Sequence, residues 1–240
     1  MPDLKETVDE LAVANRILAH EGVVDAFGHV SVRHPDDPSR FLLSRSRAPE
    51  LVTPGDIREF TFDGQPVEDR GESQYGERPI HGSIYAARPD VMSVVHSHSL
   101  EVIPFGIAEN LKLRPLAHVC APIGADIPVW DIRDRFGPTN LLVLTNEQGQ
   151  DLARGLGNAR VALMRGHGSV VAAGSLQAAV MTAIYLQVNA RLQLQLTGCG
   201  EINALTPEEV ALCTARQLGP LAMRKAWDYW VDRCGYRPGT

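Results

Sequence analysis

Apolar residues recur at helical spacing near the start of the chain and again in its last third. Leu4, Leu11 and Leu18 share one face, and Gly22 follows as a stop, so an amphipathic helix is predicted there. The segment SLQAAVMTAIYLQVNARLQLQL (175–196) predicts the longest helix of the chain. Because this helix is apolar on more than one face, we expect it to lie between a sheet and another layer.

Short β-prone runs bounded by Pro, Asp or Gly predict strands between these helices. They are HVSVRH (29–34), FLLS (41–44), VMSVVHSHS (91–99), the extended GADIPVWDI (124–132), and RVALMRGHGSVVAAG (160–174) as two strands around a Gly-His-Gly turn. REFTFDGQPV (58–67) carries an Asp-Gly pair, a hairpin signal.

Capping residues predict the remaining helices. RPIHGSIYAA is helical up to Arg88, where Pro89 stops it, and TNEQGQDLARGLG ends at a glycine. Thr206 is an N-cap with Glu209 as its capping-box partner, and a last helix carries Trp227, Tyr229 and Trp230. The regular β-α alternation of a doubly wound fold is missing. We therefore expect one layered α/β domain over residues 1–240, with a mixed or mostly antiparallel central sheet.

Composition and charge narrow the possible functions. The formal net charge is −6, and the densest basic spot, Ser44–Arg47 (SRSR), is too small for a nucleic-acid footprint, so a small anionic substrate is favoured. Four cysteines without Cys-x-x-Cys spacing argue against a zinc ribbon or disulfide scaffold and indicate reduced thiols in the cytoplasm. With no signal-peptide pattern and no apolar run near the ~18 residues of a membrane span, no membrane association is expected.

The pair His96 and His98 is the first candidate for chemistry. Residues i and i+2 of a strand face the same side, about 6.5–7 Å apart, so both imidazoles can converge on one cation. His167, between two glycines that permit a sharp turn, is the candidate third ligand. Three histidines with an open position are typical of a catalytic metal site. The alternative is that each is an ordinary hydrogen-bonded histidine, and spacing alone does not bring His167 to the pair.

Glu77 precedes a predicted helix, four residues before His81. It is either a helix cap or dipole partner, or a general acid/base beside the metal.

At this point the chain resembles the class II aldolase/adducin-like family. The segments FGHVSVRHP, TPGDI, E..IHGSIYAARPDVMSVVHSHS and RGHG.VV..G occur here in that family's order, over most of the chain. The resemblance implies a three-layer α/β/α fold and a homotetramer with active sites at subunit interfaces. It also implies that His96, His98 and His167 bind a divalent metal and that Glu77 is catalytic.

Departures from the family's phosphosugar members point to a different substrate. Their Gly-Asn-x-Ser phosphate loop is Gly-His29-Val-Ser31 here, and their Ser-Ser pair before the glutamate is Tyr75-Gly76, although Thr53 of TPGD survives. The chain looks most like the family's decarboxylases of 3-hydroxy-2-methylpyridine-4,5-dicarboxylate or 3,4-dihydroxyphthalate. The metal would chelate the ortho hydroxyl and carboxylate, while Glu77 transfers a proton.

The last expectation for the site concerns the residues that would bind a second carboxylate of the substrate. Arg45 or Arg47 could hold a spectator carboxylate in two-pronged geometry, with His29 beside it. Solvated loop arginines and a histidine hydrogen-bonded in the core are the alternatives. The ligands do not choose a metal: aldolase relatives suggest Zn²⁺ and the decarboxylases Mn²⁺, one ion per subunit. A sugar-phosphate aldolase or epimerase, and a non-catalytic adducin-like interaction module, are the competing functions.

Overall fold

The computed structural model describes residues 3–238. Within them, seven strands form one sheet in the order β3-β2-β1-β4-β7-β6-β5. The strands are β1 (His29–Arg33), β2 (Arg40–Ser44), β3 (Ile57–Thr61), β4 (Ser93–Ser97), β5 (Val129–Trp130), β6 (Val161–Met164) and β7 (Gly168–Ala173). Neighbours pair antiparallel except β5 with β6, which is parallel, so the sheet is mixed.

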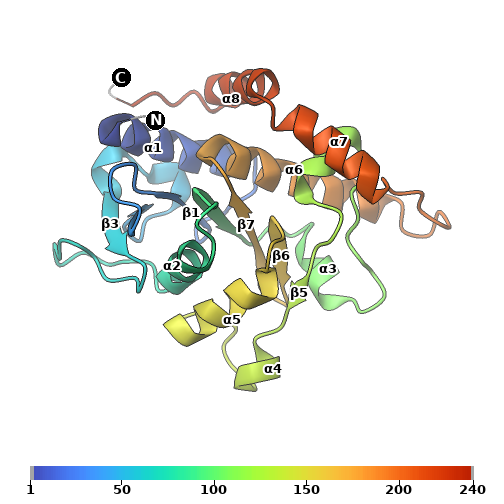
Figure 1. The fold of residues 1–240 in the computed structure, drawn as a ribbon, viewed down its shortest axis with the longest axis horizontal. Helices are drawn as coiled ribbons and strands as arrows, with labels where there is room; N and C mark the ends of the chain where they lie inside the picture. The colour runs from blue at the N-terminus through green and yellow to red at the C-terminus, as the bar shows by residue number, and fades with distance from the viewer. Residues whose placement is uncertain (1–2, 239–240) are drawn as a thin grey trace.

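Helices cover both faces of this sheet (Figure 1). The α-helices are α1 (Leu4–His20), α2 (Arg78–Ala87), α3 (Ile103–Ile107), α4 (Arg133–Phe136), α5 (Asn146–Leu156), α6 (Leu176–Gln195), α7 (Pro207–Gln217) and α8 (Pro220–Cys234). Three 3₁₀ turns are η1 (Pro49–Leu51), η2 (Pro54–Asp56) and η3 (His118–Ile123). Helices α1, α6 and α8 lie on one side, and α2 and α5 on the other.

The alternation of side chains along the strands divides the interior into two cores. Val95 and Val171 pack towards α1 and α6, while their neighbours Val94 and Val170 pack towards α2 and α5. Because both faces are covered, the central strands are buried throughout, as in β4, where every residue is buried. The predicted α/β/α layering is confirmed. His96 has the parity of Val94 and therefore lies on the α2/α5 side.

The predicted ends of the helices are mostly confirmed. Thr206 and Glu209 form the expected capping box, and Thr145 forms another at the start of α5, which ends at Gly157. The hairpin expected at 58–67 is only partly formed: β3 turns back at Gly64, but the return makes one isolated bridge, Phe60 to Pro66. Proline lacks the N–H that a longer ladder would need.

Across residues 3–238, none of the helices has both the length and the apolar character required to cross a membrane.

Candidate metal centre

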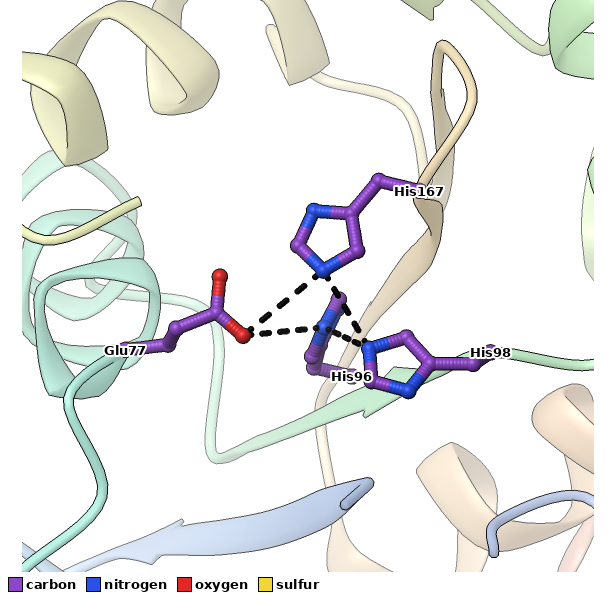
Figure 2. Close-up of side chains that lie close together, drawn as sticks. All are labelled: Glu77, His96, His98 and His167. Atoms are coloured by element: carbon purple, nitrogen blue, oxygen red, sulfur yellow. Dashed lines mark hydrogen bonds and ion pairs between the residues drawn. The ribbon is translucent and has the colours of Figure 1, made fainter. Parts of the chain in front are cut away.

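Four side chains from distant parts of the sequence converge on one point. One nitrogen or oxygen from each of Glu77, His96, His98 and His167 lies within 4.8 Å of the others. The Nε2 atoms of His96 and His98 are 3.0 Å apart, and those of His98 and His167 are 3.2 Å apart. Figure 2 shows the Glu77 carboxylate directed at these imidazoles, with its Oε2 3.5 Å from His96 Nε2 and 3.7 Å from His167 Nε2. The predicted meeting of His167 with the pair is confirmed.

Strand pairing brings His167 to the pair. Antiparallel β4 and β7 are in register from Ser93↔Ala173 to Ser97↔Ser169, so the end of β4 lies beside the start of β7. Gly168 permits this approach, because a Cβ there would lie 2.1 Å from the Ser97 carbonyl oxygen. The β4 strand spans Ser93–Ser97, two residues shorter at each end than the predicted 91–99, so His98 lies immediately beyond the strand and not within it.

Hydrogen bonds orient the imidazoles. His96 is fully buried, and its Nδ1 lies 3.1 Å from the Ser169 carbonyl oxygen, which can only accept a proton. That bond puts the proton on Nδ1 and leaves the Nε2 lone pair for a cation, the usual arrangement around a metal-binding histidine. His98 Nδ1 lies 3.8 Å from the carboxylate of Asp25, beyond hydrogen-bonding distance.

Glu77 occupies the N-cap position of α2, but its side chain makes no capping bond. Instead, its Oε1 accepts a hydrogen bond of 3.0 Å from the Val143 N–H, and its Oε2 faces the histidines. Burial alone would raise the pKa of Glu77, but the neighbouring His96 and His167 and the Val143 N–H together lower it to about 2. Glu77 is therefore an anion at neutral pH, and the capping alternative is not what the structure shows.

Burial keeps His167 and His98 neutral. It lowers the pKa of His167 to about 4, assisted by neighbouring His96, and it lowers the pKa of His98. Neutral imidazole is the form that binds metals.

The donor set fits a divalent cation. A tetrahedral ion with metal–nitrogen distances of ~2.0–2.1 Å needs ligand atoms about 3.3 Å from one another. The observed nitrogen separations of 3.0 and 3.2 Å are close to that value. The three nitrogens occupy only three positions of such an ion, so at least one position would remain open for substrate oxygens, with the Glu77 carboxylate beside it. His96, His98 and His167, with Glu77, are the residues that would hold it.

A cavity of about 380 Å³ adjoins the cluster. It is lined by Ala26, Phe27, His29, Ser46, Arg47, Ala48, Tyr75, Gly76, Glu77, His98, Leu142 and Leu144. The walls are mainly apolar, and Arg47 is the cationic side chain among the lining residues.

Four of the seven residues predicted to bind substrate line this cavity, namely His29, Arg47, Tyr75 and Gly76. The other three do not line it. Arg45 pairs with Asp56 at 2.7 Å, and Thr53 donates its hydroxyl to the same carboxylate within the capping box of η2. Ser31 is buried beneath His29 and bonded to His81.

The segment 139–145 is a part of the site that sequence reasoning missed. From residue 141 to residue 145, each backbone N–H group donates to a side chain: Leu141 to Thr139, Leu142 to Asn140, Val143 to Glu77, and both Leu144 and Thr145 to Gln148. Among residues 3–238, Leu141 is the non-glycine residue with positive φ (68°), a conformation that side chains with a Cβ rarely adopt. This fixed loop carries Leu142 and Leu144 to the cavity. Its series of short polar residues and leucines has no helical or strand period that could have revealed it.

Comparison with known proteins gives a consistent picture. Residues 9–194 match the family model described as Class II Aldolase and Adducin N-terminal domain. The decarboxylase tropJ of Talaromyces stipitatus is 37% identical, over 90% of this chain and 89% of that protein. A 3,4-dihydroxyphthalate decarboxylase of Arthrobacter keyseri is 32% identical, over 80% of this chain and 79% of that protein.

Among solved structures, L-fuculose 1-phosphate aldolase from Glaciozyma antarctica PI12 superposes with a TM-score of 0.77, covering 96% of this chain and 89% of that one. At 20% identity this likeness concerns the fold alone. The chain therefore belongs to the class II aldolase and adducin N-terminal domain family, within which its sequence resembles decarboxylases, as the motifs predict.

Proposed function

We propose that this chain is a metal-dependent decarboxylase of an ortho-hydroxy aromatic or pyridine dicarboxylate, a carboxy-lyase. The observation that carries the proposal is the cluster of His96, His98, His167 and Glu77 at the end of a mainly apolar cavity. The similarity to decarboxylases, one of them named for 3,4-dihydroxyphthalate, supports the same reaction.

The cavity suits a flat ring that carries negative charge. Leu142, Leu144 and Phe27 provide apolar surface for the ring faces. Arg47 uses its Nε for the Leu51 carbonyl oxygen, at 2.8 Å, and its terminal nitrogens can bind a carboxylate that stays on the ring. A bound divalent cation would chelate the hydroxyl and the departing carboxylate and would withdraw electron density from the breaking carbon–carbon bond.

Glu77 is the proposed proton carrier. With a pKa of about 2 it is a base in the free site, so it must first accept a proton. The substrate hydroxyl supplies one on binding. When the bond between ring and carboxylate breaks and carbon dioxide leaves, the electron pair stays on the ring carbon, and Glu77 returns the proton to that carbon. The phenolate left behind takes its proton from solvent as product departs, which balances the reaction.

We also propose one ion per subunit, Mn²⁺ or Zn²⁺, held in a homotetramer of single-domain subunits whose sites lie at interfaces. A cytoplasmic location agrees with the free cysteines of the described residues. The exposed leucines at the cavity, Leu142 and Leu144, are surfaces that a neighbouring subunit would cover.

The sugar-phosphate alternative has weaker support. The retained Thr53 has its hydroxyl engaged by Asp56, and the ring of Tyr75 lines the cavity where small hydroxyls would be needed. The four potential ligands argue against a purely adducin-like interaction role.

The test is a substrate panel on protein reconstituted with Mn²⁺ or Zn²⁺. Carbon dioxide release from 3,4-dihydroxyphthalate or 3-hydroxy-2-methylpyridine-4,5-dicarboxylate is expected, with fuculose and ribulose phosphates inert. Glu77→Gln keeps an acceptor for Val143 but not the charge, and should lower kcat by about 10²–10⁴-fold. Glu147→Gln, on an exposed side chain, is its control. Turnover of a sugar phosphate with no release of carbon dioxide from any ortho-hydroxy acid would refute the proposal.

A further inference from the structure

A buried chain of hydrogen bonds runs from the cavity into the layer between β1 and α2. His29, which lines the cavity, has its Nδ1 2.7 Å from His81 Nε2. The other nitrogen of His81 lies 2.6 Å from the Ser31 hydroxyl, which lies 2.7 Å from the Tyr85 hydroxyl. All four side chains are at most 1% exposed. None of them belongs to the metal cluster.

The sequence places these four groups face to face. His29 and Ser31 are alternate residues of β1, so both point to the α2 side of the sheet. His81 and Tyr85 are four apart on α2 and lie one above the other on the face that meets β1. The polar residues on one face of β1 therefore meet the polar residues on the facing side of α2, within a core that is otherwise apolar.

Proton counting restricts the chain to three arrangements. Both rings are buried and bonded to each other through Nδ1 of His29 and Nε2 of His81, and neither has a carboxylate partner among the hydrogen bonds of residues 3–238, so each ring is neutral and carries one proton. With the two hydroxyls there are four protons for three hydrogen bonds, and one proton must point out of the chain. Either His29 carries N–H on Nε2, or Ser31 accepts from both neighbours and directs its own O–H elsewhere, or Tyr85 directs its O–H away from Ser31.

The second and third arrangements lack an acceptor. Among the hydrogen bonds of residues 3–238, Ser31 Oγ is partnered by His81 Nδ1 and the Tyr85 hydroxyl, the Tyr85 hydroxyl is partnered by Ser31 Oγ, and no other acceptor for either hydroxyl proton is found. A buried hydroxyl proton without an acceptor is costly. Tyr85 therefore donates to Ser31, Ser31 to His81 Nδ1, and His81 Nε2 to His29 Nδ1.

We infer that His81, Ser31 and Tyr85 are positioning residues that fix His29 as the Nε2–H tautomer, a hydrogen-bond donor for a carboxylate of the substrate. With Nδ1 engaged by His81, Nε2 is the nitrogen that remains for a ligand. Two donors, His29 and Arg47, then bind oxygens of an anionic ring in the cavity. The use of Nε2–H by substrate rests on the proposed function, whereas the tautomer itself does not.

The tautomer can be measured without any substrate. In the whole chain loaded with Zn²⁺ and labelled with ¹⁵N-histidine, two-bond ¹⁵N–¹H correlation spectra distinguish Nδ1–H from Nε2–H rings. We expect His29 and His81 both to be Nε2–H, with His29→Asn and His81→Gln used to assign their signals. Tyr85→Phe removes the last donor and should give His29 a mixture of tautomers. An Nδ1–H or doubly protonated His29 in the unmodified chain would overturn the inference.

Steady-state kinetics, measured on a substrate from which the enzyme releases carbon dioxide, separates a positioning role from simple structural support. His81→Phe keeps a ring in place but loses the bond to His29, and KM should rise about tenfold with kcat changed less than about threefold. His81→Gln, whose amide can donate to His29 while its oxygen accepts from Ser31, should recover most of that loss. His34→Phe removes another buried histidine, which accepts N–H groups from Asp36 and Asp37, and should reduce stability without changing KM. An equal rise in KM for the Phe and Gln variants of His81 would refute a positioning role.

Discussion

Buried imidazoles next to one buried carboxylate define the electrostatics of this centre. Burial disfavours protonation of His167, while Glu77 stays ionised because His96 and the Val143 N–H stabilise its charge. The free site therefore carries a negative charge and several free lone pairs, which attract a divalent cation. Each group keeps its protonation state because of specific neighbours, so single substitutions should have distinct effects.

Replacing a ligand should abolish metal binding. His167→Ala removes one of three nitrogens and is expected to lower bound metal far below one ion per chain and activity by at least about a hundredfold. Metal content by elemental analysis, with decarboxylation rates, measures both. His20→Ala, at the exposed end of α1, should leave both unchanged. Full metal occupancy in the His167 variant would contradict the assignment.

The metal-free chain should lose stability as the pH falls from about 6.5 to 4. His81 and His167 have folded pKa values of about 3 and 4, below the 6.5 of a free histidine, so the unfolded chain takes up protons first. Above pH 6.5 both histidines are neutral in the folded and the unfolded chain, so they cost no stability. Below pH 6.5 each histidine lowers the free energy of unfolding by up to about 1.4 kcal/mol per pH unit, down to its folded pKa. Below pH 4.5 protonation of Glu77 in the unfolded chain adds to the loss, down to its folded pKa of about 2.

Urea unfolding at a series of pH values measures this dependence. His81→Gln should reduce the slope by about one proton between pH 6.5 and 4, whereas an unchanged slope would show that His81 is not buried as a neutral ring.

At the scale of elements, two close contacts build the site. The first is the approach of β7 to β4 at Gly168, and the second is the loop 139–145, whose N–H groups from Leu141 to Thr145 are each tied to a side chain. Neither contact is local in sequence: Val143 meets a carboxylate 66 residues earlier. The loop is held in place before substrate arrives, as a preorganised wall requires.

Gly168→Ala tests the first contact. The added methyl group would lie 2.1 Å from the Ser97 carbonyl oxygen, so β4 and β7 must separate. We expect a loss of about 1–3 kcal/mol in the free energy of unfolding and weaker metal binding, measured by urea titration and metal analysis. Gly174→Ala, at the other end of β7, meets its nearest atom at 3.8 Å and should be tolerated. Equal behaviour of the two variants would show that the close approach does not shape the site.

The elements that the sequence predicts well are those with local signals. Caps such as Thr206 with Glu209 are contacts within one turn, and the β-prone run 93–97 forms a strand that is buried on both faces, so both can be read from the chain. Strand order, the parallel pairing of β5 with β6, and the short helix α4 depend on distant packing. Likewise, the H-x-H pair is visible in sequence, whereas the contact of His81 with His29 needs α2 to lie on β1.

For the whole molecule, the centre joins three segments that lie far apart in the sequence. Glu77 belongs to the α2 end, His96 and His98 to the β4 end, and His167 to the turn before β7. A bound cation would therefore stabilise the folded chain against global unfolding, because the unfolded chain cannot bring these ligands together.

Removing the metal should lower Tm measurably. At a free metal concentration of about a hundred times Kd, binding adds about 2.7 kcal/mol, which corresponds to roughly 5–10 °C for a chain of this size. Scanning calorimetry before and after treatment with a chelator measures the change. The His167→Ala variant should show no such shift on addition of metal, and a shift of the same size there would place the ion elsewhere.

The long sequence separation of the β4–β7 pair also sets when a cation can act during folding. His98 and His167 are 69 positions apart, so the loop between them must close and the two strands must pair before both rings can bind one ion. The ion then enters a nearly finished structure, slows unfolding, and leaves the folding rate unchanged. A chain made without metal would accumulate as a folded, inactive protein and would become active when metal is added, without being refolded.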